Sequence, residues 1–283
     1  MTITELKRSF LAELIKEYPC EEANSFFGLL TEAYLGMSRF QVALQREKEI
    51  SETDLAKFKS AKQRLLDQEP IQHILGKTEF FGLHFQVSKK VLVPRPETEE
   101  LVQWILDDLE SENKKIQLLD IGAGSGCIAI SLAKNLPEAE IFAMDISAQA
   151  LETAMLNAEN NKVVINFAEK DVLKLEELGQ DFNVIVSNPP YVRELEKADM
   201  QPNVLRYEPG TALYVKDDDP LVFYRKIAGL AQKALVPGGK LYFEINQYLG
   251  PETEKLLQEY GFKTELRKDI YGNFRMLKGV KET

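Results

Sequence analysis

The chain has 283 residues, of which 44% are hydrophobic and 28% charged, as in ordinary globular proteins. Its formal net charge of −10, from 45 acidic and 35 basic residues, argues against tight non-specific binding to nucleic acid, which requires a cationic surface. No apolar run is as long as a membrane span, the N-terminus lacks signal-peptide features, and two distant cysteines predict no disulfide framework, so we expect a reduced, cytoplasmic protein.

The first 70 residues carry a helical pattern throughout. Thr2 and Glu5 have the spacing of a capping box, and Leu6, Phe10 and Leu14 fall on one helical face. Segments of similar style begin at residues 21 and 51, and Pro, Gly or Ser bounds each of them. No residue type here points to catalysis. We therefore expect a small helical bundle over residues 1–75, whose role is either structural or recognition of a partner.

The pattern changes from Lys77. Short apolar and aromatic runs, separated by turn residues, predict a β-hairpin that links two domains across residues 76–95. Pro96 is suited to the first turn of a helix, and Glu97 and Glu99 would lie favourably near the positive end of its dipole.

From Ile116 the pattern alternates between strand and helix. Strands are predicted at 116–122, 140–145, 163–171, 182–190, 240–246, 263–270 and 274–279, and helices at 127–136, 147–161, 220–235 and 251–261. This alternation predicts an α/β domain over residues 96–283, with a parallel sheet covered on both faces. Only a short turn separates the last two strands, so we expect one of them to run antiparallel at the edge of the sheet.

A glycine loop follows the first of these strands. Gly122, Gly124 and Gly126 allow a tight turn and a close approach of a ligand to the backbone. Asp145 ends the next strand, where an acid in this class of fold bonds ribose hydroxyls. The combination predicts that the loop binds a nucleoside cofactor and is not merely a ligand-free turn, but it does not identify the cofactor. The third glycine comes one residue too early for the pattern of dinucleotide-binding loops. This spacing is compatible with S-adenosylmethionine, which has no phosphate for the loop to bind.

Two residues after the third strand complete the expected cofactor site. Asp171 is placed to reach an adenine amino group, and Val172 would offer an apolar face to the ring.

The sequence "NPPY" stands directly after the apolar fourth strand. Pro189 and Pro190 donate no backbone N–H, and the second proline keeps the first extended, so the segment is rigid. It therefore presents the Asn188 side-chain oxygen and the Pro189 carbonyl as two fixed acceptors, which suit an –NH₂ group. Tyr191 would supply a flat face for a planar amide or a base. The alternative is that Asn-Pro-Pro merely ends the strand.

Further stretches support one family. They are "PIQHILG" (70–76), "VLVPRPETEELV" (91–102), "YEP" (207–209), "LVPGG" (235–239), "EINQ" (244–247) and "DIYGNFR" (269–275). Together with "DIGAGSG" and "NPPY", they resemble the bacterial HemK/PrmC family, which methylates N5 of the glutamine in the Gly-Gly-Gln motif of peptide chain release factors. The resemblance covers most of the chain. "NPPY" alone also occurs in DNA and RNA methylases.

The resemblance implies a seven-stranded, Rossmann-like class I S-adenosylmethionine-dependent methyltransferase fold, with an N-terminal helical domain for substrate recognition. It also implies a cytoplasmic enzyme that acts on release factors as a monomer, without DNA, membrane or metal. The implied cofactor contacts are Gly122, Ala123, Gly124, Ser125, Gly126, Asp145, Asp171, Val172 and Asn188. The implied catalytic residues are Asn188, Pro189 and Tyr191, and Asn188, Pro189, Pro190 and Tyr191 would hold the glutamine. The chain departs from the family in having Val172 where relatives often have an aromatic residue, and Asn246 where we expect glycine.

Two other functions remain open at this stage. A DNA or RNA amino-methyltransferase acting on adenine N6 would share the pocket, but it normally needs a basic recognition surface. A cofactor-binding scaffold without catalysis would not need an intact "NPPY". We expect no side-chain general base, because His73 and His84 are the chain's only histidines and both precede the strand ends.

Overall fold

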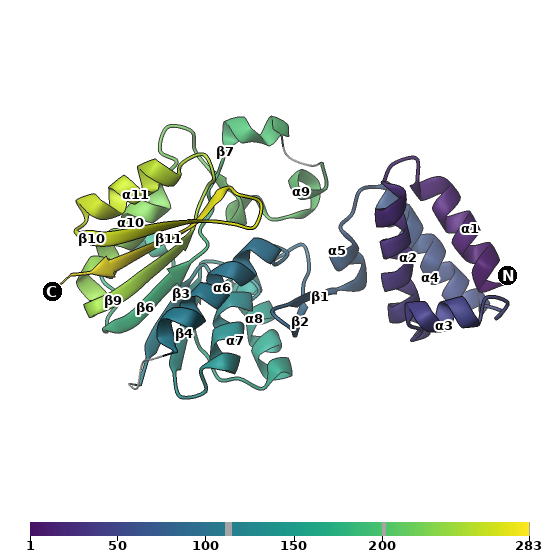
Figure 1. Cartoon of the computed structure of the whole chain (residues 1–283), viewed down its shortest axis with the longest axis horizontal. Coiled ribbons are helices and arrows are strands. Elements are labelled where there is room, and N and C mark those ends of the chain that lie inside the picture. The colour runs from purple at the N-terminus through teal and green to yellow at the C-terminus, as the bar shows by residue number, and fades with distance from the viewer. Residues whose placement is uncertain (111–114, 200–201, 283) are drawn as a thin grey trace. The chain divides into compact units, whose positions relative to one another are not determined.

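The computed structural model describes residues 1–110, 115–199 and 202–282, and it divides into two compact units (Figure 1). The helical unit contains Met1–Gly76 and the short helix α9 (Pro202–Tyr207). The sheet unit contains the rest of the described chain from Lys77. No helix of the described residues is long and apolar enough to cross a membrane.

The helical unit confirms the helical pattern of the first 70 residues. Its helices are α1 (Ile3–Leu14), α2 (Cys20–Leu35), α3 (Arg39–Leu44), α4 (Glu52–Leu66), α5 (Ile71–Leu75) and α9. The capping box is present, since the Thr2 side chain accepts the Glu5 N–H and the Glu5 carboxylate accepts the Thr2 N–H. Phe10, Phe27 and Phe58 form an aromatic core, with ring centroids 5.5–6.5 Å apart.

Helix α9 lies far along the chain from the other helices of its unit, and the sequence pattern did not predict it. The Tyr207 hydroxyl donates to the Asp67 carbonyl at 2.9 Å, which ties this helix to the end of α4. The chain thus returns once to the helical unit between two segments of the sheet unit.

The sheet unit contains a seven-stranded sheet and confirms the α/β prediction. Its strands are β3 (Gln117–Ile121), β4 (Glu140–Asp145), β5 (Asn166–Glu169), β6 (Phe182–Ser187), β9 (Leu235–Glu244), β10 (Phe262–Lys268) and β11 (Phe274–Lys281). They lie in the order β10-β11-β9-β6-β3-β4-β5, and the neighbours from β9 to β5 pair in parallel.

The antiparallel strand is not at the edge of the sheet, so that part of the prediction was wrong. Strand β11 pairs antiparallel with both β9 and β10, which leaves β10 at the edge. A short turn fixes the pairing of β10 with β11, but it does not determine which of them contacts β9. Burial does: β11 buries Met276 and Leu277 in the core, whereas β10 has the charged sequence "FKTELRK" that suits an edge strand.

Helices cover both faces of the sheet (Figure 1). Val184 and Val186 of β6 belong to the core cluster that includes α6 (Pro96–Leu109) and α7 (Cys127–Asn135). Ile185, which points the other way, belongs to the cluster that includes α10 (Val222–Ala234) and α11 (Gly250–Glu259). The apolar run of β6 is therefore explained by burial on both faces.

The remaining elements are short. The predicted hairpin is present as β1 (Lys77–Phe80) and β2 (Leu83–Gln86). Helix α8 (Ala148–Asn161) follows β4, and a 3₁₀ turn, η1 (Val172–Lys174), follows β5. After β6 come β7 (Val192–Arg193), η2 (Glu194–Asp199), η3 (Gly210–Ala212) and β8 (Tyr214–Val215), with β7 and β8 paired in parallel.

Replacing Gly126 by alanine should destabilise the sheet unit more than the same change at Gly179. Both glycines have φ of 81°, where a Cβ costs about 1–2 kcal/mol. Only at Gly126 would the Cβ also clash, at 2.9 Å from Ile130 Cδ1 and 3.1 Å from Ala154 Cβ. We expect this overpacking to add about 1–3 kcal/mol to the loss in free energy of unfolding for Gly126→Ala, measured by urea unfolding. Equal losses in the two variants would show that packing at Gly126 is unimportant.

Candidate functional site

The predicted site residues converge on one edge of the sheet. Residues Ile121, Met144 and Ser187 lie side by side near the carboxyl ends of β3, β4 and β6, since Ile121 is in register with both of the others. Ligands bind outside this edge in open α/β sheets. The chain directly after these strands contains the glycine loop, Asp145 and the NPPY segment, defined here as residues 188–191.

The glycine loop folds back on the end of β4. The N–H groups of Gly122 and Ala123 both donate to the Met144 carbonyl, at 2.8 and 3.0 Å. A Cβ on Gly122 would stand 4.0 Å from the Asn188 carbonyl oxygen, which places the NPPY segment beside the loop. Apart from its chain neighbours, no described atom lies within 4 Å of the place that a Cβ on Gly124 would occupy. This open space is where a ligand can approach the backbone.

Ala123 and Ser125 are buried, with exposed fractions of 6% and 2%, and Ala123 belongs to the core cluster on the α7 side of the sheet. These two predicted contact residues can therefore reach a cofactor only through their backbone. The Ser125 carbonyl accepts a hydrogen bond from the Asn157 amide at 2.9 Å.

Asp145 is held by the backbone on both sides of it. One carboxylate oxygen accepts the Gly124 N–H at 2.8 Å, and the other accepts the Ser147 N–H at 2.9 Å. Each oxygen retains acceptor capacity for a further donor. The half-buried carboxylate is therefore fixed in orientation and suited to accept hydrogen bonds from two neighbouring hydroxyls.

Asp171 and Val172 lie where the chain leaves β5, in positions that limit their contacts with a cofactor. The Asp171 carboxylate accepts the Leu173 N–H at 3.0 Å and pairs with Lys174 at 3.1 Å. Val172 is only 9% exposed, because it packs into the core on the α10 side of the sheet. Its side chain can offer a planar ring little surface.

A buried acid, Asp120, lies in the glycine motif itself. One of its oxygens accepts the Ala129 N–H at 3.2 Å, and the other has no hydrogen-bond partner within the described parts of the chain. Burial, with a smaller contribution from the charge of Asp145, raises the pKa of Asp120 to about 7. Burial raises the pKa of the Cys127 thiol to about 12, which disfavours the thiolate form.

The NPPY segment combines a free amide with an anchored tyrosine. Asn188 is half-buried, and its side chain has no hydrogen-bond partner among residues 1–110, 115–199 and 202–282. Pro189 is buried and Pro190 half-buried. The Tyr191 hydroxyl donates to Glu244 Oε1 at 3.0 Å. Burial, and then the charge of Glu244, raises the pKa of Tyr191, so the hydroxyl remains protonated.

Glu244 is the last residue of β9, and only 1% of it is exposed. Besides Tyr191, it accepts the Thr98 hydroxyl at 2.6 Å through its other carboxylate oxygen. Burial raises the pKa of Glu244, while these two hydrogen bonds and the charge of Arg275 oppose the rise. The acid thus joins the start of α6 to the NPPY segment.

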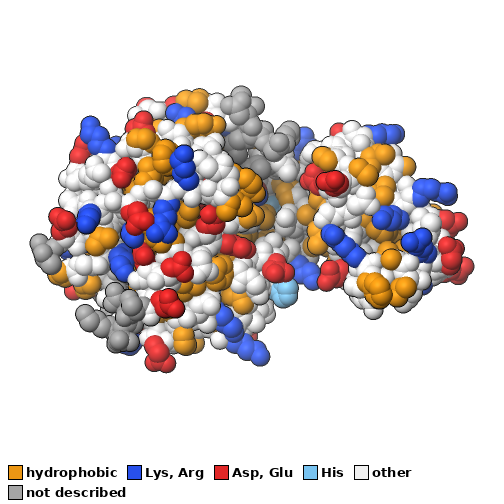
Figure 2. Space-filling view, viewed as in Figure 1, with side chains coloured by type: hydrophobic (Ala, Val, Ile, Leu, Met, Phe, Trp, Pro, Cys, Tyr) orange, Lys and Arg blue, Asp and Glu red, His pale blue; other side chains and the backbone are white. Residues whose placement is uncertain are grey.

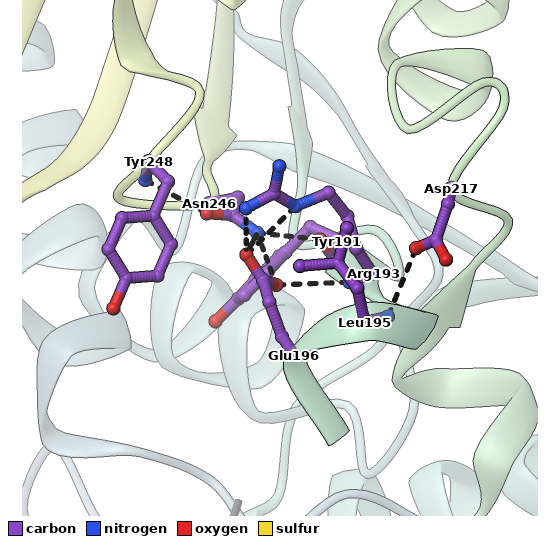
Figure 3. A network of polar contacts seen from close by, with 7 residues as sticks. All are labelled: Tyr191, Arg193, Leu195, Glu196, Asp217, Asn246 and Tyr248. Atoms are coloured by element: carbon purple, nitrogen blue, oxygen red, sulfur yellow. Dashed lines mark hydrogen bonds and ion pairs between the residues drawn. The ribbon is translucent and has the colours of Figure 1, made fainter. Parts of the chain in front are cut away.

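Asn246 lies two residues further on and is 3% exposed. Its amide donates to the Tyr191 carbonyl at 2.9 Å and to Glu196 Oε2 at 2.9 Å, and its own oxygen accepts the Tyr248 N–H at 2.9 Å. Arg193 also bonds Glu196, at 2.6 and 2.9 Å (Figure 3). Asparagine at this position, where we expected glycine, therefore connects three segments of chain.

A second ion pair joins two further motifs of the sheet unit. Arg95, just before α6, donates to both carboxylate oxygens of Glu208, at 2.6 and 2.8 Å. Burial raises the pKa of Glu208, and the charge of Arg95 opposes that rise. The pair connects the "PRPE" and "YEP" stretches, which lie far apart in the sequence.

The buried Asn157 of α8 connects the hairpin to the glycine loop. Its oxygen accepts the Gln86 N–H at 2.7 Å, and its amide donates to the Gln86 carbonyl at 3.0 Å as well as to Ser125. Asn157 shares the buried face of α8 with Leu151, Ala154 and Ala158, and an asparagine on such an apolar face is the sequence signal for this role.

Sequence reasoning did not assign roles to Thr98, Glu244 or Asn246. All three stand in the stretches "PRPETE" and "EINQ", so their motifs were visible. Their pairing with Tyr191 was not visible, because it depends on how a helix, a loop and a strand meet in space.

Comparisons with known proteins agree with this geometry. The family model of the PrmC N-terminal domain matches residues 8–76, and that of the methyltransferase small domain matches residues 99–206. A methyltransferase from Pyrococcus furiosus has a similar fold, with a TM-score of 0.52 at 17% identity, over 82% of this chain and 100% of that one.

Two curated relatives align over almost their whole length. The release factor glutamine methyltransferase of Flavobacterium psychrophilum is 51% identical over 281 residues, which are 98% of this chain and 99% of the relative. The protein of that name from Bacteroides thetaiotaomicron is 43% identical over 262 residues, which are 92% of this chain and 93% of the relative. The chain therefore belongs to the release factor glutamine methyltransferase family.

Proposed function

We propose that this protein transfers a methyl group from S-adenosylmethionine to the side-chain amide nitrogen, N5, of the glutamine in the Gly-Gly-Gln motif of peptide chain release factors. The observation that carries the proposal is that Asn188, whose side-chain amide is free, has its backbone beside an open glycine loop, in a chain 51% identical to a release factor glutamine methyltransferase. We also propose that the enzyme works in the cytoplasm as a monomer and without a metal ion.

The cofactor is S-adenosylmethionine, and when bound it supplies an electrophilic methyl group. The residues present fit it. Asp145 is oriented to accept the two ribose hydroxyls, and the space beside Gly122 and Gly124 admits a ligand at the backbone. Asp171 would accept from the adenine amino group, whereas Val172 contributes little because it is buried. Because S-adenosylmethionine has no phosphate, the glycine loop needs no positive charge, which agrees with the absence of lysine and arginine from its sequence.

The NPPY segment would hold the substrate amide. An amide nitrogen is a poor nucleophile because its lone pair is delocalised, so its orientation matters. The Asn188 side-chain oxygen and the Pro189 carbonyl would accept the two N–H groups of the glutamine and fix the nitrogen toward the methyl group. The same acceptors favour the positive charge that builds on nitrogen during transfer.

No side-chain base is needed at this site. The attacking nitrogen is neutral and becomes strongly acidic only after the methyl group has moved, so water or a carbonyl acceptor can take the proton. His84 lies in β2 and His73 in α5, and neither element follows a strand of the large sheet.

A protein substrate agrees better with the charge distribution than a nucleic acid does. The net charge is −10, and on the face seen in Figure 2 the basic and acidic side chains are interspersed over both units. A DNA or RNA methylase depends on cationic contacts with phosphates.

We assign recognition of the release factor body to the N-terminal helical domain, residues 1–75, which makes up most of the helical unit. Helix α3 buries none of its residues, and its Phe40 and Leu44 side chains are 71% and 69% exposed. Large exposed apolar side chains at neighbouring helical positions are suited to bind a protein.

Asp145→Ala should weaken cofactor binding by about tenfold or more, because each hydrogen bond to a charged carboxylate contributes about 1.5–3 kcal/mol. Calorimetric titration with S-adenosylmethionine measures the change. Asp181→Ala, which removes an exposed acid near the start of β6, is the control and should leave the affinity as it is. An unchanged affinity in Asp145→Ala would remove this residue from the cofactor site.

Asn188→Ala should lower the rate of methyl transfer about 10²-fold or more, by analogy with the loss of one preorganised hydrogen-bonding group in an active site. The assay is a single turnover with labelled cofactor, a purified release factor and DNA in one mixture. We expect the wild type to label the release factor glutamine and not the DNA. Labelled DNA adenine with an unlabelled release factor would overturn the assignment of the substrate, and a normal rate in the variant would overturn the role of Asn188.

The double substitution of Phe40 and Leu44 by serine should raise KM for an intact release factor about tenfold, since buried anchors contribute most of an interface's energy. Calorimetric affinity for the cofactor should not change. Val164→Ser, at an 89% exposed position of the sheet unit, is the matched control. A KM equal to that of the control would show that α3 does not contact the substrate.

A further inference from the structure

Tyr191 is anchored at both of its ends by one strand terminus. Glu244 accepts the hydroxyl at 3.0 Å, and Asn246 donates to the backbone carbonyl at 2.9 Å. The two anchors are two residues apart, and Ile245 between them is fully buried on the α10 side of the sheet. One short segment of β9 and its continuation therefore controls both the ring and the main chain of the tyrosine.

The anchor segment is itself rigid. Strand β9 pairs with β6 on one side and with β11 on the other, with Glu244 opposite Met276. Beyond the end of the strand, the Ile245 N–H still donates to the Arg275 carbonyl at 2.9 Å. The position of Tyr191 is thus determined by its bonds to a strand inside the sheet, and not by the surface loop that contains it.

The main-chain anchor is braced in turn. Glu196 accepts from the Asn246 amide at 2.9 Å, and its carboxylate also pairs with Arg193 at 2.6 Å and accepts the Arg193 N–H at 3.0 Å (Figure 3). The turn that follows the NPPY segment is therefore closed onto Asn246. A glycine in place of Asn246 would lack the side-chain bonds to Tyr191 and Glu196.

We propose that Glu244 and Asn246 are positioning residues, which clamp Tyr191 so that its ring forms a fixed wall of the amide pocket. This inference rests on the proposed function, because it assigns the wall to the substrate glutamine. Glu244 acts through Tyr191 and does not touch the substrate. The charged and titratable groups that interact with its carboxylate are Glu97 from α6, Cys127 from α7, Tyr191 from the loop, Tyr224 from α10 and Arg275 from β11.

The clamp matters because amide methylation depends on orientation. A displacement of about 1 Å in a positioning group can lower a rate on the order of 10²-fold. Releasing the tyrosine should therefore lower kcat and leave cofactor affinity unchanged, since the expected cofactor contacts other than Asn188 lie at or just after the ends of β3, β4 and β5.

Glu244→Met removes the acceptor at similar volume, and Tyr191→Phe removes the hydroxyl while keeping the ring. Each should lower kcat about tenfold or more on a purified release factor, with normal calorimetric affinity for S-adenosylmethionine. Glu244→Gln should restore most of the rate, because its amide can still bond Thr98 and Tyr191. In the Tyr191→Phe background, Glu244→Met should have little further effect, as expected for two residues that act as one unit.

Asn246→Ala tests the other end of the clamp and should lower kcat severalfold, whereas Glu265→Gln, whose partners are Lys278 and Arg267, is the control and should not. All rates are normalised to the folded fraction, and Tyr191→Phe provides the test if Glu244→Met does not fold. If Glu244→Met or Tyr191→Phe keeps the wild-type kcat, or if their losses multiply, the clamp is wrong. If the wild type itself does not methylate a release factor, the proposed function is wrong instead.

Discussion

The parallel direction of five strands is the constraint on which the site depends. Because β3, β4, β5, β6 and β9 run the same way, their carboxyl ends share one edge, and every loop that leaves that edge starts beside its neighbours. Asp145, Asn188 and Asn246 therefore follow strands that end along the same edge, although about 100 residues separate the first from the last. The helices between the strands set these separations, and burial of the strands on both faces keeps the edge fixed.

Three buried acids of the sheet unit are stabilised in different ways. Glu208 accepts from one guanidinium nitrogen of Arg95 through both of its oxygens, Glu244 has two hydroxyl donors, and Asp120 has one backbone N–H. The pKa of Asp120 accordingly rises to about 7, since one donor compensates poorly for the loss of water. Only the first two acids connect separate segments of chain. Whether a buried acid holds separate segments of chain together thus depends on which hydrogen-bond donors reach its carboxylate, and not on the number of acids.

Much of this fold follows from local pattern. Apolar periodicity located the strands and helices, and the glycine loop, Asp145 and Asn188 were visible as residue types at strand ends. The misplaced antiparallel strand shows the limit, because sequence order cannot determine whether β10 or β11 contacts β9. Likewise, the Tyr191–Glu244 bond joins residues 53 apart, and no local rule pairs them. Helix α9 joins the helical unit through tertiary contacts such as the hydrogen bond from Tyr207 to Asp67, which short-range pattern does not encode.

In the proposed clamp, Glu244 acts through geometry and not through its charge. Burial raises the pKa of its carboxyl group, and what its position secures is a pair of hydrogen bonds, one from Thr98 and one from Tyr191. Methyl transfer to an amide requires the nitrogen lone pair to face the methyl group, so a ring that is already held in place needs no reorganisation at the moment of reaction. A residue that is too deeply buried to touch the substrate can thus still favour the transition state over the ground state, because it fixes the ring against which the amide is oriented.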